Sequence, residues 1–204
     1  MKPSVIPAFL LLLLFSFPLL SQDGNADKLY EEGLRRYAAT TGTVSYQITG
    51  DASGTVHYQF ALAGWLEATV WDIEYELYGI KNRENRLEYR DGDTAYTINL
   101  TTLKGSRSDA VRESELIRYK SAEETREAIY RSQGGTKTGT TVLLDKEVVI
   151  WEFENTSLIT IWEWNGLILK ARRKIGKATY EYTAISLDLD GEVAIGLPEN
   201  ITFN

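Results

Sequence analysis

The 204-residue sequence contains no cysteine, one histidine, and one methionine at position 1. Without cysteine there is no disulfide framework, no thiol nucleophile and no lipid attached to an N-terminal cysteine. The single histidine, His57, cannot build the usual histidine-rich metal site, and no Gly-x-Ser-x-Gly nucleophile motif accompanies it. These absences predict no catalytic residues, no metal and no cofactor, so we expect a protein that is not an enzyme.

Basic residues are outnumbered by acidic ones. The chain has 22 Lys and Arg against 29 Asp and Glu, a formal net charge of −7. An acidic surface repels phosphate backbones and anionic lipid head groups, so nucleic acid is not an expected partner. Tyrosine (12) and tryptophan (5) are plentiful. Both residue types pack well on half-buried sheet surfaces, which favours a β-rich protein.

The N-terminal stretch has the layout of a secretory signal peptide. A positive start at Lys2 precedes a nearly unbroken apolar run over residues 5–20, after which the chain turns polar. The run is short and contains two prolines, which disfavours a stable transmembrane anchor. We predict a signal peptide over residues 1–22 and a single domain over residues 23–204, periplasmic or otherwise exported and soluble after cleavage. A retained N-terminal anchor is the alternative.

Beyond the leader, the apolar periodicity changes along the chain. Residues 28–37 predict one short amphipathic helix, and from Gly42 apolar residues alternate with polar ones, as in strands with one buried face. The charged segment 108–133 predicts a helical insert, with Ser121 and Glu124 as a capping box. Strand patterns then resume around Asn-Gly at positions 165–166, the strongest hairpin signal in the chain.

This order of elements predicts the fold class. We expect a mainly β (α+β) protein in which a strongly curved antiparallel sheet of about ten strands forms an incomplete barrel, because a sheet of that size must curl. A short N-terminal helix and a central helical lid would complete it. No pattern of parallel crossovers is present, which disfavours an α/β enzyme fold.

Aromatic residues on the predicted strands are the candidate ligand-binding residues. If aromatic rows face the hollow of a half-barrel, they would suit acyl chains or other hydrophobic ligands. The alternative is that they form the core beneath the helix. The candidate residues are Trp71, Tyr75, Trp151, Phe153, Trp162 and Trp164.

Three carboxylates leave an enzymatic alternative open. Asp72, Glu74 and Glu76 share the polar face of one predicted strand. Paired carboxylates can perform acid–base chemistry where their surroundings separate their pKa values. A row of acids on a solvated face also protects a sheet from aggregation, and we favour that interpretation.

Two hairpins and their spacing carry a resemblance to a known family. Residues 85–98 form a strand pair around Asp-Gly, residues 161–170 form another around Asn-Gly, and the helical insert lies between them. This layout is similar to that of the periplasmic lipoprotein-carrier superfamily, the LolA/LolB-like proteins, and of uncharacterised exported domains like them. The resemblance covers most of the mature chain and implies an unclosed antiparallel barrel with a helical lid. Its hydrophobic hollow would take lipoprotein acyl chains or another lipid.

The functional expectation is an exported, non-enzymatic protein that binds a lipid or other hydrophobic ligand in the hollow of a half-barrel. An envelope protein is a further candidate partner. The alternative is a cell-envelope interaction or scaffold domain with a filled core and no ligand. An open cavity lined by Trp151, Phe153, Trp162 and Trp164 would favour binding, and close packing of these residues against helix 121–132 would favour a scaffold.

Overall fold

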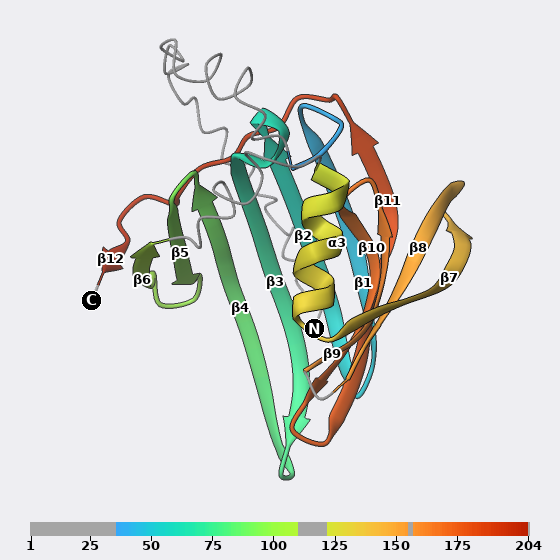
Figure 1. Cartoon of the computed structure of the whole chain (residues 1–204). Helices are drawn as coiled ribbons and strands as arrows, with labels where there is room; N and C mark the ends of the chain where they lie inside the picture. The colour runs from blue at the N-terminus through green and yellow to red at the C-terminus, as the bar shows by residue number, and fades with distance from the viewer. Residues whose placement is uncertain (1–35, 110–121, 155–156, 204) are drawn as a thin grey trace, which may run out of the picture.

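The structure is a computed structural model that describes residues 36–109, 122–154 and 157–203 (Figure 1). The elements in chain order are β1 (Gly42–Gly50), β2 (Ala52–Ala61), the 3-10 turn η1 (Leu62–Gly64), β3 (Leu66–Leu77), β4 (Ile80–Asp91), β5 (Thr94–Asn99), β6 (Lys104–Asp109), α3 (Ala122–Ser132), β7 (Gly135–Leu143), β8 (Lys146–Phe153), β9 (Leu158–Trp164), β10 (Leu167–Ile175), β11 (Ala178–Leu189) and β12 (Thr202–Phe203). Among the described residues α3 is the only α-helix, and no helix there is long and apolar enough to cross a bilayer.

All twelve strands belong to one sheet, in the order β12-β6-β5-β4-β3-β2-β1-β11-β10-β9-β8-β7. Neighbouring strands are antiparallel except for the short parallel pair of β12 and β6. Within the described residues the two edge strands do not pair, so the sheet stays open. Figure 1 shows the sheet curving around α3, which lies in front of β1 and β2. The prediction of a mainly β, unclosed antiparallel sheet is confirmed.

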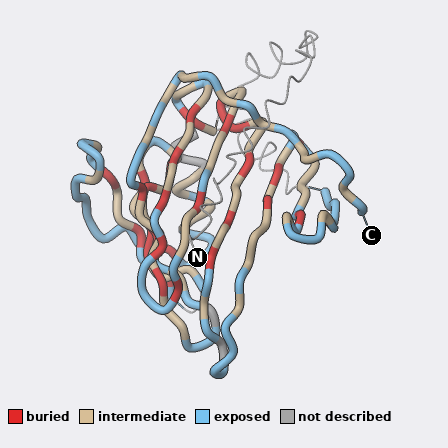
Figure 2. The backbone as a smooth tube through the Cα atoms, turned by 180° about the vertical axis from the view of Figure 1, so that it is seen from behind, coloured by how far each residue is buried: buried red, intermediate tan, exposed pale blue. Residues whose placement is uncertain are grey.

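Period-two alternation creates the buried face of the central strands. On β1, Val44, Tyr46 and Ile48 are buried, and they alternate with more exposed polar residues. On the neighbouring β2, Val56 lies opposite Tyr46 in the register, and Phe60 is fully buried. Successive side chains of a strand point to opposite faces, so this pattern concentrates apolar groups on one side of the sheet. Figure 2 shows these buried residues recurring along the strands.

The buried side chains form three clusters. The largest combines residues of β1, β2, β3, β10 and β11, and a second lies over β3, β4 and β5. The third contains Trp151, Phe153, Ile161 and Ala171, with Tyr130 of α3 packed against it. The helix is therefore held on the sheet by aromatic contacts with β8.

Two turns show how far local signals reach. The predicted hairpin at positions 165–166 is confirmed, because Asn165 (φ 48°) and Gly166 (φ 91°) join β9 to β10 in left-handed conformations that suit Asn-Gly. The turn expected at Asp91-Gly92 lies one residue later. Asp91 still pairs with Thr94 in the ladder, so Gly92 and Asp93 form the loop.

The helical predictions have different outcomes. The helix expected over residues 28–37 lies almost wholly outside the described residues, and the described Arg36 and Tyr37 belong to a bend. The insert expected over residues 108–133 is helical over Ala122–Ser132, whereas residues 110–121 lie outside the description. Its start was wrong: Ser108 and Asp109 end strand β6. Pairing with β5, where Ser108 lies opposite Ala95, outweighs the charged composition of that segment.

Candidate functional site

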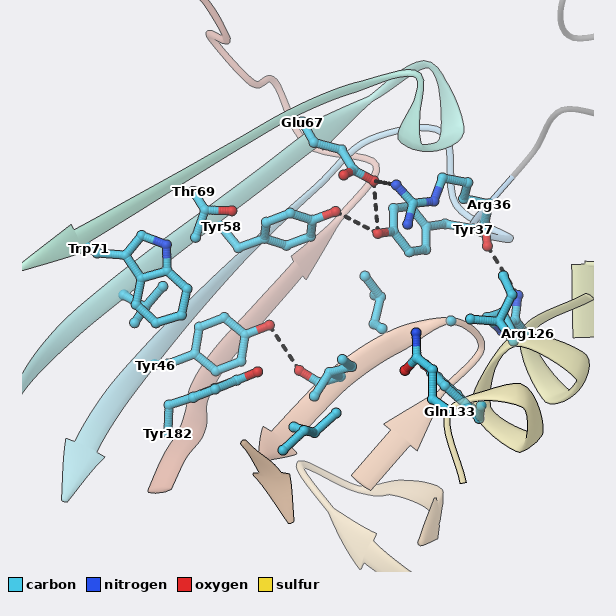
Figure 3. Close-up of a pocket in the computed structure, with 17 residues that line it drawn as sticks. Arg36, Tyr37, Tyr46, Tyr58, Glu67, Thr69, Trp71, Arg126, Gln133 and Tyr182 are labelled. Atoms are coloured by element: carbon cyan, nitrogen blue, oxygen red, sulfur yellow. Dashed lines mark hydrogen bonds and ion pairs between the residues drawn. The ribbon is translucent and has the colours of Figure 1, made fainter. Parts of the chain in front are cut away.

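A cavity of about 390 Å³ lies between the concave face of the sheet and α3 (Figure 3). Strands β1, β2, β3, β10 and β11 form one wall, and α3 forms the opposite one. Its aliphatic lining residues are Val56, Ile129, Leu158, Leu167 and Ile168. Its aromatic lining residues are Tyr37, Tyr46, Tyr58, Trp71, Tyr130 and Tyr182. The lining is thus mostly apolar and aromatic, as in many small-molecule sites.

The sheet wall of the cavity contains aromatic rings that pack edge to face. The ring of Tyr182 meets those of Tyr46 and Trp71 edge to face, with centroids 5.5 Å and 5.9 Å apart. The indole Nε1 of Trp71 donates to a carboxylate oxygen of Glu88 at 3.0 Å, and the Arg86 guanidinium lies 5.1 Å from the Trp71 ring centroid. These contacts hold the aromatic rings in fixed orientations, so the wall is preformed.

One end of the cavity carries a polar chain of hydrogen bonds. The Tyr58 and Tyr37 hydroxyls lie 2.6 Å apart, and the Tyr37 hydroxyl donates to Glu67 Oε1 at 3.0 Å. The Arg36 guanidinium pairs with the same oxygen at 2.8 Å. Burial raises the pKa of Tyr37 and of Tyr58 well above the usual range, and Glu67 raises both further. Both phenols are therefore neutral at physiological pH.

A second ion pair ties α3 to the turn between β9 and β10. Arg126 Nε lies 2.9 Å from Glu163 Oε1, which also accepts a hydrogen bond from the Gly166 amide at 2.7 Å. Arg126 also donates to the Arg36 carbonyl at 3.1 Å. At Gly166 a Cβ would lie 2.8 Å from that same carbonyl, so only glycine lets the chain at residue 36 approach the turn this closely.

Of the six aromatic residues predicted from the sequence, Trp71 lines the large cavity. Tyr75 lies further along β3, partly buried against the main core. Trp151 and Phe153 pack against Tyr130 of α3, with ring centroids 5.3 Å and 5.9 Å away. Phe153 therefore meets the criterion that favours a filled core, whereas Trp151 also borders a smaller, more polar pocket of about 140 Å³.

The remaining two candidates lie near lysines. Lys170 Nζ lies 4.8 Å from the ring centroid of Trp162, and Lys146 Nζ lies 4.8 Å from that of Trp164. Glu163 contacts Arg126 of α3. Trp162 alternates with Ile161 and Glu163 along β9, so it lies on the face of the sheet that points away from α3. A role in ligand binding stays a prediction for all six residues, Trp71 included.

Sequence reasoning missed most of the aromatic lining. Tyr37, Tyr46, Tyr58, Tyr130 and Tyr182 line the cavity and were absent from the candidate set. For Tyr46 and Tyr58 the signal was present, because each alternates with polar residues on an amphipathic strand. No local pattern brings Arg126 to Glu163, since 37 residues separate them.

The acidic row on β3 forms surface ion pairs. Arg83 of β4 contacts Asp72 at 3.1 Å and Glu74 at 3.9 Å, and all three side chains are well exposed. His57 is exposed as well, with its Nδ1 3.2 Å from the Ser45 hydroxyl. Within the described ranges no group of three or more His, Cys, Asp or Glu side chains is placed to hold a metal ion.

Comparisons with known proteins identify a fold and no family. No protein-family model matches the sequence, and no curated protein matches it. An uncharacterised conserved protein from Thermus thermophilus superimposes with a TM-score of 0.50 at 9% identity, covering 88% of this chain and 98% of that one. The chain therefore shares its overall fold with this uncharacterised protein.

Two mycobacterial structures are more distantly similar. LprF from Mycobacterium bovis superimposes with a TM-score of 0.36 at 9% identity, covering 85% of this chain and 96% of that one. The lipoprotein LppX from Mycobacterium tuberculosis superimposes with a TM-score of 0.34 at 12% identity, covering 83% and 99%. The described residues of the chain form an open, curved antiparallel sheet with a cavity under one helix.

Proposed function

We propose that this chain is an exported, non-enzymatic protein that binds a lipid or another hydrophobic molecule in the cavity beneath α3. The observation that carries the proposal is the cavity itself. Its volume is about 390 Å³, aromatic rings pack edge to face on its sheet wall, and a few polar groups lie at one end. Sites of this size and lining are typical of small-molecule binding. Export rests on the signal-peptide pattern of residues 1–22.

Affinity would come mainly from burial of the ligand's apolar surface, at about 25 cal/mol per Å² before the cost of association. Helix α3 would act as the lid, because it forms one wall through Ile129 and Tyr130, and Gln133 directly follows its last residue. The Arg126–Glu163 ion pair would hold this lid on the turn between β9 and β10. Ligand entry would then require α3 to move away from the sheet.

Native mass spectrometry of the mature protein, purified from the envelope of cells that export it, tests the proposal. A bound mass that is released as lipid on denaturing extraction is the expected result. An apo mass, together with no uptake of an added fluorescent hydrophobic probe, would overturn it.

A matched pair of variants locates the site in the same probe assay. Ile129→Trp fills the cavity from the helix side, and we expect it to reduce probe uptake about tenfold or more. Ile185→Trp changes a 59% exposed residue on β11 and should leave uptake unchanged. Equal uptake by the two variants would place probe binding outside the cavity.

The second candidate function is a cell-envelope scaffold with no ligand. The packing of Tyr130 on Trp151 and Phe153 favours it, because these rings occupy much of the space between α3 and β8. This alternative expects the apo mass and a protein partner recovered by crosslinking in the envelope.

A further inference from the structure

The hydrogen-bonding groups of the cavity narrow the class of its ligand, an inference that rests on the proposed function. We infer that the ligand is an uncharged amphiphile whose head group carries hydroxyl, ester or amide groups. An anionic lipid, such as a fatty-acid carboxylate, is not what this lining fits. The argument depends on which polar groups of the cavity are already paired and which are available.

The charged groups of the lining are already paired with one another. Arg36 contacts Glu67 at 2.8 Å, and the side chains are 27% and 15% exposed. Arg126 contacts Glu163 at 2.9 Å, and those side chains are 20% and 10% exposed. A carboxylate ligand that bound either arginine would displace a protein carboxylate in a poorly solvated site. Separating a partly buried pair in this way is strongly unfavourable.

Three tyrosine hydroxyls of the lining are also engaged in hydrogen bonds. Tyr58 and Tyr37 bond each other, and Tyr37 donates to Glu67. The Tyr46 hydroxyl donates to the Ile168 carbonyl at 2.9 Å. These three phenols stabilise the cavity wall, so they offer a ligand little further hydrogen-bonding capacity.

Four uncharged groups of the lining are available to a ligand. They are the hydroxyls of Thr69, Tyr130 and Tyr182 and the side-chain amide of Gln133, and none has a side-chain hydrogen-bond partner in the described part of the chain. Thr69 and Tyr182 lie on the sheet wall, and Gln133, which directly follows the last residue of α3, lies on the opposite side of the cavity, as Figure 3 shows. Hydroxyl and amide groups donate to and accept from neutral polar heads without requiring a charge.

The cavity would therefore bind neutral and anionic head groups with different affinities. A neutral head can hydrogen-bond to the four available groups while both ion pairs stay intact. An anionic head group loses its hydration on entering the cavity, and both arginines there are already paired with carboxylates. Its transfer from water is therefore costly in a poorly solvated site. The lining thus selects by charge even though the acyl chain contacts would be the same.

Displacement of a bound fluorescent hydrophobic probe tests the inference. The competitors are a monoacylglycerol and a fatty acid with the same acyl chain, at a pH where the fatty acid is ionised. We expect the monoacylglycerol to displace the probe at about tenfold lower concentration or less. Equal displacement, or preference for the fatty acid, would overturn the inference and leave the proposed function standing. If the protein takes up neither the probe nor either competitor, the proposed function itself fails.

Charge-changing variants sharpen the test. Glu67→Gln keeps an acceptor for the Tyr37 hydroxyl but removes the negative charge beside Arg36, so fatty-acid affinity should rise about tenfold with monoacylglycerol affinity little changed. Glu74→Gln, on the same strand but 66% exposed, is the control and should change neither affinity. If a folded Glu67→Gln protein gains no affinity for the fatty acid, the inference fails.

A second substitution keeps the test valid if Glu67→Gln does not fold. Thr69→Val removes one available hydroxyl with little change in volume. It should weaken monoacylglycerol binding severalfold and leave fatty-acid binding unchanged. An equal loss for both ligands would contradict the assignment of Thr69 to the head group.

Discussion

The two flanks of α3 differ in how completely they are packed. Toward β8, Tyr130 meets Trp151 and Phe153, which are only 3% and 7% exposed, and the pocket that remains there is small, about 140 Å³. Toward β1, β2 and β3, the same helix borders a cavity of about 390 Å³ through Ile129. One flank therefore holds the helix in place, while the other leaves space that a ligand can fill. Close packing on one side lets the other side stay open without loss of the fold.

The largest expected effect comes from truncating the packed flank. Trp151→Ala removes a buried indole, and we expect the free energy of unfolding to fall by about 3–5 kcal/mol in chemical denaturation. Ile129→Ala, on the open flank, enlarges an existing cavity and should cost about 1 kcal/mol or less. Similar losses for the two variants would mean that the flanks do not differ in packing.

An intermediate effect is expected at the ion pair that joins the helix to the sheet. Arg126→Met leaves Glu163, whose side chain is 10% exposed, without its guanidinium partner and should cost about 2 kcal/mol. Hydrogen exchange should also become faster in α3, because the helix detaches more often. Arg131→Met, on the same helix, breaks an exposed pair with Glu127 and a cation–π contact with Trp151, and should cost less than about 1 kcal/mol. Equal hydrogen-exchange rates of the α3 amides in the two variants would show that the Arg126–Glu163 pair does not hold α3 on the sheet.

The smallest expected effect comes from titration of the cavity tyrosines, which changes stability only at alkaline pH. Burial raises the pKa of Tyr182 to about 12, whereas the pKa of tyrosine in an unfolded chain is about 10. Between these values the unfolded state binds fewer protons than the folded state, so stability falls as pH rises through this window and is unaffected below it. Unfolding measured across the alkaline range should show this slope, and Tyr182→Phe should reduce it. An unchanged slope in Tyr182→Phe would show that Tyr182 is not protected from solvent.

Sequence reasoning predicted the features that depend on neighbouring residues. Alternation on β1 and β2 and the turn at Asn165-Gly166 are local properties, since they follow from side-chain period and from backbone conformations that glycine and asparagine tolerate. The prediction failed at Ser108 and Asp109, where a charged segment pairs with β5 at the margin of the sheet. A short, mostly exposed strand has no buried face, so it leaves no periodic signal.

The candidate site was predicted only in outline. Of the predicted strand aromatics, Trp71 lines the cavity, whereas Trp151 and Phe153 pack beneath the helix. All of them lie on amphipathic strands and look alike in the sequence. Their surroundings differ because the position of α3 over the sheet determines which rings it covers.

The amino-acid sequence by itself determined an antiparallel, β-rich chain, where several of its turns lie, and which strand residues are apolar, because each depends on contacts among near neighbours. The tertiary structure alone decided that Arg36 meets Glu67 and that Arg126 meets Glu163, pairs separated by 31 and 37 residues. It also decided which flank of α3 is packed and which borders the cavity. The physical reason is that strand register and helix placement minimise the free energy of the whole sheet, which no short segment encodes.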